Sequence, residues 1–517
     1  MKNKKILVVG AGNAGRPAAK LLHHLGNEVL VTEIKEFEKL PPKAKKRIKK
    51  MQKNGIRFHF GGHHPKDIEW ADSIFISPNI PKNSIIYELI KKTEKEIEYI
   101  TPPMIGRMLN SFIKIPMVGV AGTDGKTTTT NMIKHIIEGQ HPTISFSSLE
   151  DSLVIEGLVD LLIEDKLGEG EFAVFELPHG TIRMTQGLEL CAGIITTLTP
   201  DHLDEFKDYD DYIRRNFLIK DLIDQKGLLI LNGDDPIINR LTSEIESPHI
   251  IYSVGRKRKM EFHGKSYVTK PLPADVKAEK IKLNGLKGSE FTLTIGRIPT
   301  IICERCGSIK CECGNFRREY FGPYKERVTL KVPGIFNVEN ALAAITTGLI
   351  LGFDIDYLKK RMGEFKGIRG RFEVIDEVNG VKIYMDAAHN PESMEKLFEG
   401  LEFDGRLIIS LDNPDTLTVR DKFKIGRTLA KAADILIVSA KNETTEKIDW
   451  KAAEEVAKGA NPTKTIIVEN VYKSIKKAIE NSEKGDTIIH MGPGVVNAYQ
   501  NVKKDIQRAI KNYKEKL

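Results

Sequence analysis

The chain has 517 residues, which at roughly 100–200 residues per domain predicts about three domains. Hydrophobic residues make up 40% and charged residues 29%, a balance that excludes a disordered or fibrous protein. No apolar run reaches the roughly 18–20 residues that cross a bilayer, so we expect a cytoplasmic protein with no membrane partner. Lys and Arg number 79 against 71 Asp and Glu, and because the two signs alternate along the chain, this surplus alone does not distinguish a nucleic acid from an anionic small molecule.

The first predicted domain covers residues 1–110 and opens as strand, Gly-rich turn, helix and strand over residues 4–33. This order predicts a Rossmann-like α/β domain. Its turn has the pattern GxGxxG, made by Gly10, Gly12, Asn13, Ala14 and Gly15. Glu33 ends the next strand, where an acidic residue binds a ribose in dinucleotide-binding domains. Read alone, the turn predicts a dinucleotide and an oxidoreductase, and a purely structural turn stays open.

Two further α/β regions follow. Residues 111–366 form the predicted central domain, which begins with the apolar strand pattern at 115–122. Inside it, residues 255–330 show short alternating strands and a cysteine cluster, which indicates a β-rich insertion. Residues 367–517 form the predicted C-terminal α/β domain, which starts at the Gly-rich segment GIRGRFE.

A phosphate-binding loop is predicted at GTDGKTTTT, between a buried strand and an amphipathic helix. Backbone N–H groups in such a loop point at nucleotide phosphates, the lysine reaches the β- and γ-phosphates, and the following hydroxyl holds Mg²⁺. The strict spacing of the common P-loop pattern is absent, because Val120 stands where its first glycine would fall. The predicted loop residues are Gly122, Thr123, Asp124, Gly125, Lys126, Thr127 and Thr128.

A metal site is predicted from four of the five cysteines. Cys303, Cys306, Cys311 and Cys313 lie within eleven residues, a spacing that lets four thiolates surround a tetrahedral Zn²⁺. Four thiolates leave no open coordination position, so the zinc is expected to be structural. A zinc ribbon in a basic chain also raises nucleic-acid binding, which we disfavour because the basic residues do not gather around aromatic ones near the cluster.

Five segments after the loop complete a family resemblance. After GTDGKT come ELPHG, LTPDHLDEF, LNGDDP, PGIFNVENALAA and then GRFE with MDAAHNPES. The chain resembles the ATP-dependent Mur ligase family, which includes folylpolyglutamate synthetases, because these motifs stand in the order of that family. The resemblance covers nearly the whole chain and implies the three-domain Mur ligase architecture, with an N-terminal Rossmann-like domain, a central ATPase domain and a C-terminal Rossmann-like domain.

The resemblance also implies site roles. Thr127 and Glu176 would hold one Mg²⁺ and His202 a second, with Lys126, Glu176 and His202 as the catalytic set. The remaining ATP-binding residues would be Asn232 and Asn337 at the adenine, with Arg371 and Asp386 from the third domain. Many members carry a carbamylated lysine on the helix after the Asp-His motif; that position is Asn216 here, and Lys220 lies one turn further.

The implied activity is an ATP-dependent amide-bond ligation through an acyl phosphate. The Mur ligases that share the GAGNAG turn use it to hold a UDP-linked substrate, so Gly10–Gly15 and Glu33 would bind a UDP-linked amino acid or peptide precursor. A free amino acid would be the second substrate, with ATP, Mg²⁺ and structural Zn²⁺ as cofactors. The mixed signature and the cysteine insertion resemble archaeal ligases of pseudomurein synthesis. A folylpolyglutamate-synthetase-like ligase and an NAD(P)-dependent oxidoreductase are the alternatives. We expect a monomer that does not bind nucleic acid.

Overall fold

The computed structural model describes residues 2–93, 95–149, 153–200, 206–262, 265–270, 272–301, 320–399, 401–413 and 421–515. Two compact units divide the chain. Unit 1 comprises residues Met1–Ile251, Ile298–Phe321 and Thr347–Gly352, and unit 2 comprises Tyr252–Arg297, Gly322–Thr346 and Phe353–Leu517. The predicted boundaries near residues 110 and 366 stay predictions.

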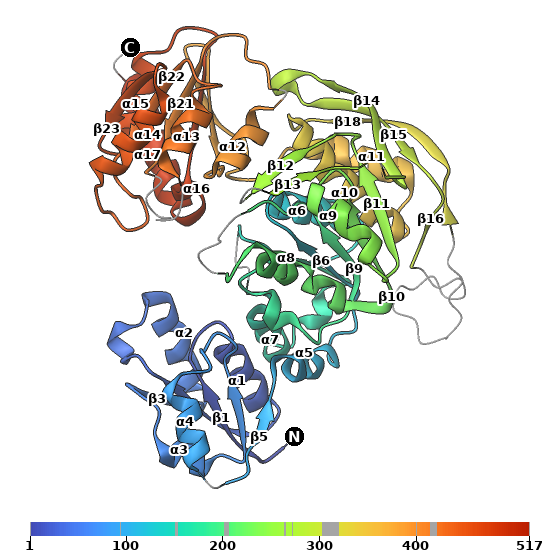
Figure 1. Ribbon diagram of the computed structural model, residues 1–517, viewed down its shortest axis with the longest axis vertical. Helices are drawn as coiled ribbons and strands as arrows, with labels where there is room; N and C mark the ends of the chain where they lie inside the picture. The colour runs from blue at the N-terminus through green and yellow to red at the C-terminus, as the bar shows by residue number, and fades with distance from the viewer. Residues whose placement is uncertain are drawn as a thin grey trace. The chain divides into compact units, whose positions relative to one another are not determined.

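The N-terminal part of unit 1 is a five-stranded parallel sheet in the order β3-β2-β1-β4-β5. Because right-handed crossovers run outward from β1 in both directions, helices cover both faces, as the blue part of Figure 1 shows. The sheet buries Leu7, Val9, Leu30 and Ile74. The strands are β1 (Lys5–Val9), β2 (Glu28–Glu33), β3 (Arg57–Phe60), β4 (Ser73–Ile76) and β5 (Glu98–Ile100), and the helices are α1 (Gly15–His24), α2 (Pro42–Lys53), α3 (Pro65–Trp70), α4 (Ile85–Lys92) and α5 (Pro102–Asn110).

The second part of unit 1 contains five neighbouring parallel strands of a larger sheet, in the order β10-β9-β6-β8-β7. Its central strand β6 is buried along its whole length, which is why its sequence reads as an unbroken apolar run. The strands are β6 (Met117–Ala121), β7 (Thr143–Phe146), β8 (Phe172–Glu176), β9 (Leu190–Ile195) and β10 (Ile223–Asn232), and the helices are α6 (Lys126–Glu138), α7 (Val154–Ile163), α8 (Tyr209–Phe217) and α9 (Pro236–Leu241).

Unit 2 begins inside β11 (His249–Ser253) and contains antiparallel strands in the region predicted to be β-rich. β15 pairs antiparallel with both β14 and β18, and its side chains alternate between buried and half-buried, as expected for a strand with one covered face. The elements here are β12 (Lys259–Phe262), β13 (Lys265–Val268), β14 (Val276–Leu283), β15 (Ser289–Ile295), β18 (Tyr324–Leu330), α10 (Ile335–Ile350) and α11 (Ile355–Glu364).

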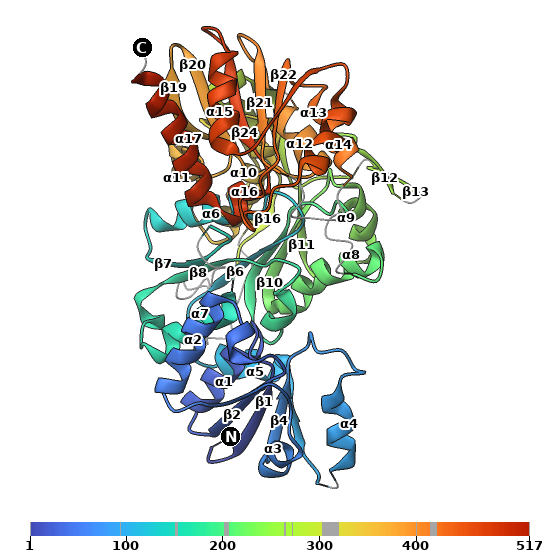
Figure 2. The same ribbon diagram turned by 90° about the vertical axis from the view of Figure 1, so that its left-hand side faces the viewer.

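The C-terminal part of unit 2 is a six-stranded sheet in the order β19-β20-β24-β21-β22-β23, with β19 antiparallel and the others parallel. Figure 2 shows α15 and α17 on one side of this sheet and α13 and α14 on the other, and each face has its own apolar core. The strands are β19 (Glu373–Val378), β20 (Val381–Asp386), β21 (Leu407–Leu411), β22 (Ile435–Ser439), β23 (Lys464–Val468) and β24 (Thr487–Met491), and the helices are α12 (Pro391–Phe398), α13 (Lys422–Leu429), α14 (Trp450–Ala460), α15 (Val471–Glu480), α16 (Pro493–Asn497) and α17 (Tyr499–Lys514).

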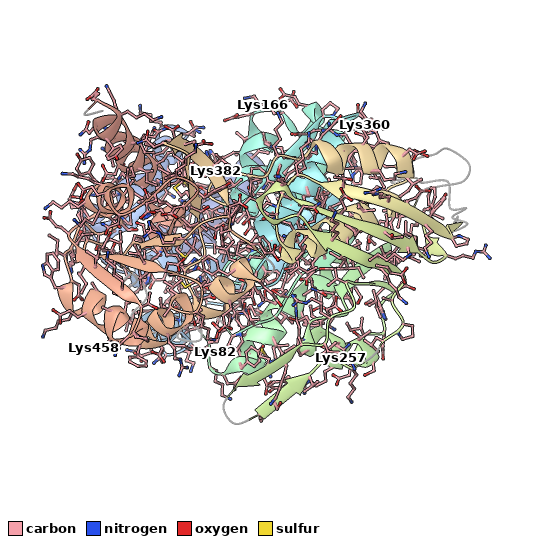
Figure 3. All side chains as sticks on the ribbon, turned by 90° about the horizontal axis from the view of Figure 1, so that it is seen from above. Lys82, Lys166, Lys257, Lys360, Lys382 and Lys458 are labelled. Carbon is pink, nitrogen blue, oxygen red and sulfur yellow. The ribbon has the colours of Figure 1, made fainter. Side chains whose placement is uncertain are left out.

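The surface carries lysines from many segments of the chain. Those labelled in Figure 3 are all exposed: Lys82, Lys166, Lys257, Lys360, Lys382 and Lys458. Within the described residues, no helix combines the length and the apolar character that a membrane span requires.

Candidate active site

The loop predicted to bind phosphate joins the carboxyl end of β6 to α6. Gly122 has φ +128°, and a Cβ there would lie 2.4 Å from Thr196 Oγ1. Gly125 precedes α6 in the left-handed conformation, with φ +84°. Both positions therefore need glycine. No side chain caps the first turn of α6, so its backbone N–H groups are suited to an anionic ligand.

The residues after β9 hold this loop in place. Thr123 N donates to Thr197 O at 2.7 Å, and Asp124 N donates to Thr197 Oγ1 at 3.0 Å. The Thr123 hydroxyl lies 2.6 Å from the Tyr212 hydroxyl, and Thr196 Oγ1 donates to Asp124 O at 2.6 Å. These contacts fix the loop before any ligand arrives, which is the preorganisation that electrostatic catalysis requires. Sequence reasoning missed these partners, although the hydroxyl-rich run after β9 was a usable signal.

Lys126, the first residue of α6, turns back over the loop. Its Nζ donates to Thr123 O at 2.6 Å. A carbonyl is a neutral partner, so this bond leaves the ammonium charge available to a phosphate.

Thr127 and Glu176 lie together, as the family resemblance implies. Thr127 Oγ1 donates to Glu176 Oε1 at 3.2 Å, and Ser148 N donates to Glu176 Oε2 at 2.9 Å. The Ser148 hydroxyl lies 2.8 Å from Thr127 Oγ1. Glu176 is buried at the end of β8. A hydroxyl and a carboxylate are the hard oxygen donors that Mg²⁺ prefers, so this pair fits the cation. His202 and the four zinc-site cysteines lie outside the described residues, and among the described residues no group of three His, Cys, Asp or Glu could hold a metal.

Asn232 ends β10 at the same edge of the sheet. Its Oδ1 accepts from Asp234 N at 3.0 Å, while its Nδ2 is buried and makes no hydrogen bond. A buried donor of this kind costs free energy unless a ligand satisfies it.

Helix α8, which follows the Asp-His motif, carries no lysine at the position where family members are carbamylated. Asn216 is buried there and donates from Nδ2 to Tyr212 O at 3.0 Å. Lys220 is half exposed and lies 3.4 Å from Asp221, so it is a surface lysine in this structure.

The N-terminal Gly-rich turn has the close packing its sequence requires. Gly10 has φ +94°, and a Cβ on Gly15 would lie 1.7 Å from Gly10 O, so only glycine fits at position 15. Glu33 turns back to the turn: its Oε2 accepts from Ala11 N at 2.9 Å and its Oε1 from Lys35 N at 3.1 Å. Gly12 has open space around it.

In unit 2, Asp386 ends β20 and organises the segment that carries Arg371. Asp386 Oδ2 accepts from Phe372 N and Oδ1 from Ala388 N, each at 2.7 Å. Phe372 is left-handed, with φ +48°. Burial raises the pKa of Asp386, and the positive charge of Arg371 opposes that shift.

Asn337, in the first turn of α10, has both of its amide atoms bonded within unit 2. Its Nδ2 donates to Pro333 O at 2.7 Å, and its Oδ1 accepts from Asn340 Nδ2 at 3.4 Å.

Comparison with known families identifies the class. The Mur ligase middle domain matches residues 120–298, and the Mur ligase glutamate ligase domain matches residues 370–494. The chain belongs to the Mur ligase family and is an ATP-dependent amino-acid ligase of the α/β, three-sheet architecture. The pyridine nucleotide-disulphide oxidoreductase family also matches, over residues 5–72.

Individual relatives extend over most of the chain. The UDP-N-acetylmuramoylalanine--D-glutamate ligase of Thermoanaerobacter pseudethanolicus is 24% identical, over 95% of this chain and 93% of that protein. An uncharacterized protein of Methanothermobacter thermautotrophicus is 55% identical, over 53% of this chain and 87% of that protein. A solved structure of a pseudomurein peptide ligase type C from Methanothermus fervidus is 26% identical, with a TM-score of 0.58, over 98% of this chain and all of that chain.

Proposed function

We propose that this ligase joins an amino acid to the carboxylate of a UDP-linked cell-wall precursor, in pseudomurein synthesis. The observation that carries the proposal is the preorganised loop with Lys126, Thr127 and Glu176 at one sheet edge. The similarity to the pseudomurein peptide ligase of Methanothermus fervidus, along nearly the whole chain, supports the cell-wall role.

The proposed reaction has two steps. A carboxylate oxygen of the precursor attacks the γ-phosphorus of ATP, ADP leaves, and an acyl phosphate forms. The amine nitrogen of the amino acid then attacks the carbonyl carbon, phosphate leaves with its bonding electrons, and the nitrogen loses a proton. Both steps concentrate negative charge on phosphate oxygens.

Several residues of this chain are placed to stabilise the negative charge on the phosphate oxygens. The α6 N-terminus and Lys126 would hold the β- and γ-phosphates, and Thr127 with Glu176 would hold Mg²⁺. When bound, Mg²⁺ neutralises phosphate charge. By family resemblance His202 would hold a second Mg²⁺.

The adenine and the precursor have separate candidate sites. The unsatisfied Nδ2 of Asn232 supports a role at the adenine, because a ring nitrogen would accept a hydrogen bond from it. Asn337, Arg371 and Asp386 keep their proposed nucleotide roles by resemblance. The Gly10–Gly15 turn would hold the UDP diphosphate at the start of α1, because an uncapped helix N-terminus favours anions.

An NAD(P)-dependent oxidoreductase is the second candidate, because an oxidoreductase family matches residues 5–72. Against it, the Mur ligase middle domain and the Mur ligase glutamate ligase domain match residues 120–298 and 370–494, beyond the Gly-rich turn. A folylpolyglutamate-synthetase-like ligase would use the same ATP loop with a different carboxylate substrate.

The proposal is tested by ADP release in the presence of MgATP, a UDP-linked peptide and a panel of single amino acids. Amino-acid-dependent ADP release with a new peptide bond in the product supports it. Release that requires a folate and glutamate identifies the folylpolyglutamate reaction, and hydride transfer without ADP release would overturn the ligase assignment.

Lys126→Ala tests the role of the loop, with a second lysine variant on the same helix as its control. It should lower ligation at least about 10²-fold, the scale for loss of one preorganised electrostatic group. Lys134→Ala, on the same helix and paired with Glu138 at 3.5 Å, is the control and should leave the rate unchanged. Undiminished ADP release by folded Lys126→Ala would refute the role of the loop.

A further inference from the structure

A group of charges with a buried centre joins the Gly-rich turn to helix α7 within unit 1. We call it the Glu156 cluster; its members are Arg16, Lys20, Arg47, Glu156 and Asp160. The side chains of Arg16 and Glu156 are each 4% exposed. Arg16 and Lys20 come from α1, Arg47 from α2, and both carboxylates from α7.

Arg16 bonds to both sides of this junction. Toward α7, its Nε donates to Glu156 Oε1 at 3.1 Å and its Nη2 to Glu156 Oε2 at 3.0 Å. Toward the Gly-rich turn, its Nη1 donates to Ala11 O and its Nη2 to Asn13 Oδ1, each at 2.9 Å. A planar guanidinium fixes the angle between the groups it bonds, so the turn has a defined orientation relative to α7.

Two more cations converge on the same carboxylate. Lys20 Nζ donates to Glu156 Oε1 at 3.0 Å and also binds Asp160. Arg47 Nη1 donates to Glu156 Oε2 at 3.1 Å. Burial favours the neutral acid, but the hydrogen bonds and charges of Arg16 and Lys20 outweigh burial and lower the pKa of Glu156. Glu156 is therefore ionised and holds three cations from two helices.

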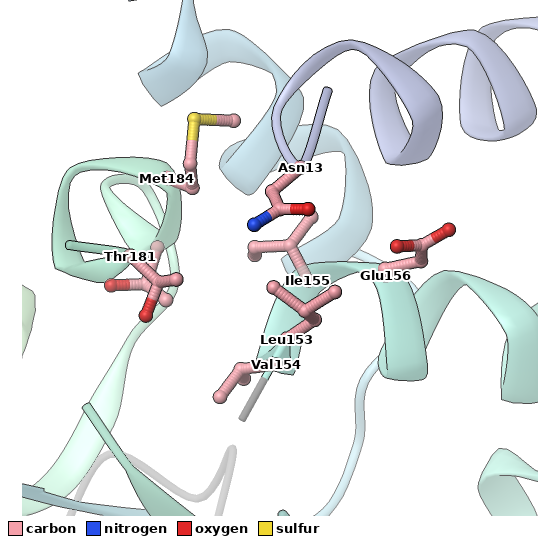
Figure 4. Close-up of a pocket in the computed structure, with 8 residues that line it drawn as sticks. Asn13, Leu153, Val154, Ile155, Glu156, Thr181 and Met184 are labelled. Carbon is pink, nitrogen blue, oxygen red and sulfur yellow. The ribbon is translucent and has the colours of Figure 1, made fainter. Parts of the chain in front are cut away.

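A small pocket adjoins this cluster. Figure 4 shows Thr181 and Met184 on one side, and Asn13 of the turn and Glu156 of α7 across from them. The pocket's cavity volume is only about 10 Å³, which is room for a single water molecule. Its walls thus come from the turn proposed to bind the precursor, from the start of α7 and from residues 181–185.

The segment before α7 reaches the ATP loop. Ser148, eight residues before Glu156 in the chain, donates its backbone N–H to Glu176 and lies 2.8 Å from the Thr127 hydroxyl. The contacts that place the proposed magnesium ligands and those that place the Gly-rich turn thus lie close together in one stretch of chain.

We propose that Glu156 is a positioning residue that holds the precursor-binding turn in register with the ATP loop. This inference rests on the proposed function. Acyl phosphate formation requires the precursor carboxylate and the γ-phosphate near 3 Å apart, and a misplacement of about 1 Å costs about 10²-fold in rate. Stability alone does not account for the cluster, because well-packed apolar side chains usually stabilise such a junction at least as well as buried ions.

Three variants test the proposal. Glu156→Gln removes the charge that holds three cations, and Arg16→Lys keeps the charge but loses the planar fork between α7 and the turn. Glu164→Gln is the control, because Glu164 lies at the other end of α7 and pairs with Lys50 of α2 only through an exposed contact at 3.4 Å. The measurements are kcat and KM for the UDP-linked peptide, affinity for an ATP analogue, and hydrogen exchange of residues 10–16.

We expect Glu156→Gln and Arg16→Lys to lower kcat/KM for the UDP-linked peptide at least tenfold and to speed exchange at residues 10–16. ATP-analogue affinity should stay within twofold, and Glu164→Gln should match the wild type. If Glu156→Gln does not fold, the kcat/KM and the exchange rates of Arg16→Lys decide whether the proposal holds. Folded variants with unchanged kcat/KM and unchanged exchange would overturn the proposal.

Failure of the proposed function gives a different result. If the wild type releases no ADP with any UDP-linked peptide, the proposed function fails, and UDP affinity together with exchange at residues 10–16 then decides the role of Glu156. Faster exchange and weaker UDP binding in Arg16→Lys would support positioning of the turn, and no change in either would overturn it.

Discussion

Acid should destabilise the C-terminal part of unit 2 through His490. This residue lies on β24, is fully buried, and has its Nδ1 2.8 Å from Ser410 Oγ. Its Nε2 makes no hydrogen bond, and the nearest carboxylate oxygen, Asp412 Oδ2, is 3.8 Å away. Burial lowers the pKa of His490 from 6.5 to about 3, while burial raises the pKa of Asp412 well above its usual value. The folded state therefore keeps a neutral imidazole.

The direction of the effect follows from proton binding. Below pH 6.5 the unfolded chain takes up a proton at His490 and the folded chain does not, so stability present above pH 6.5 is lost as pH falls toward 3. One proton changes the free energy of unfolding by about 1.4 kcal/mol per pH unit. Between pH 7 and pH 5 the loss attributable to His490 should be about 2 kcal/mol.

Urea unfolding at pH 7, 6 and 5 measures this loss. Trp450 begins α14, which packs against the same sheet, so its fluorescence reports unfolding of the C-terminal part in a Trp70→Phe background. His490→Asn retains a hydrogen-bonding group near Ser410 and cannot titrate, so its stability should fall by about 2 kcal/mol less than that of the wild type. His24→Asn, at an exposed site on α1, should behave as the wild type. Equal slopes for His490→Asn and the wild type would refute the argument.

Three further outcomes are expected. UMP or UDP should raise the melting temperature and NADH should not, since a ligand stabilises only by binding the native state; the reverse pattern would favour the oxidoreductase. Gly122→Ala should weaken ATP binding at least tenfold, as measured by calorimetry, because its Cβ would lie 2.4 Å from Thr196 Oγ1 and overpacking costs about 1–3 kcal/mol. Cys306→Ser should lower the zinc content of protein purified without chelator and leave ATP binding intact; wild-type protein without zinc would refute that site.

The parts of the site that sequence reasoning predicted are those fixed by local geometry. Gly122 and Gly125 have left-handed or otherwise strained backbones that only glycine adopts easily, and Lys126 and Thr127 follow at fixed distances along the same helix. The role of Glu176 came from the family resemblance, because a strand-end glutamate alone is usually just solvated; in the structure Glu176 is buried at the end of β8.

The parts it missed depend on contacts between distant segments. Tyr212 meets Thr123 across 89 residues of sequence, and Arg16 meets Glu156 across 140. A helix pattern shows which face of α7 is buried, but not that a carboxylate on that face will meet three cations. Such pairings need the tertiary fold, because hydrophobic periodicity carries no information about which polar groups are opposed.

Among the described residues of unit 1, Glu156 and Glu176 are the buried glutamates, and their partners distinguish a structural acid from a ligand for a cation. Glu156 is surrounded by three side-chain cations, so its charge is already balanced and no metal would gain by binding it. The described hydrogen bonds of Glu176 come from neutral donors, the Thr127 hydroxyl and the Ser148 N–H. A buried carboxylate with neutral partners is electrostatically costly until a cation arrives. That imbalance supports the proposal of Mg²⁺ at Glu176, and it agrees with the proposed role of Glu156 in orienting the Gly-rich turn.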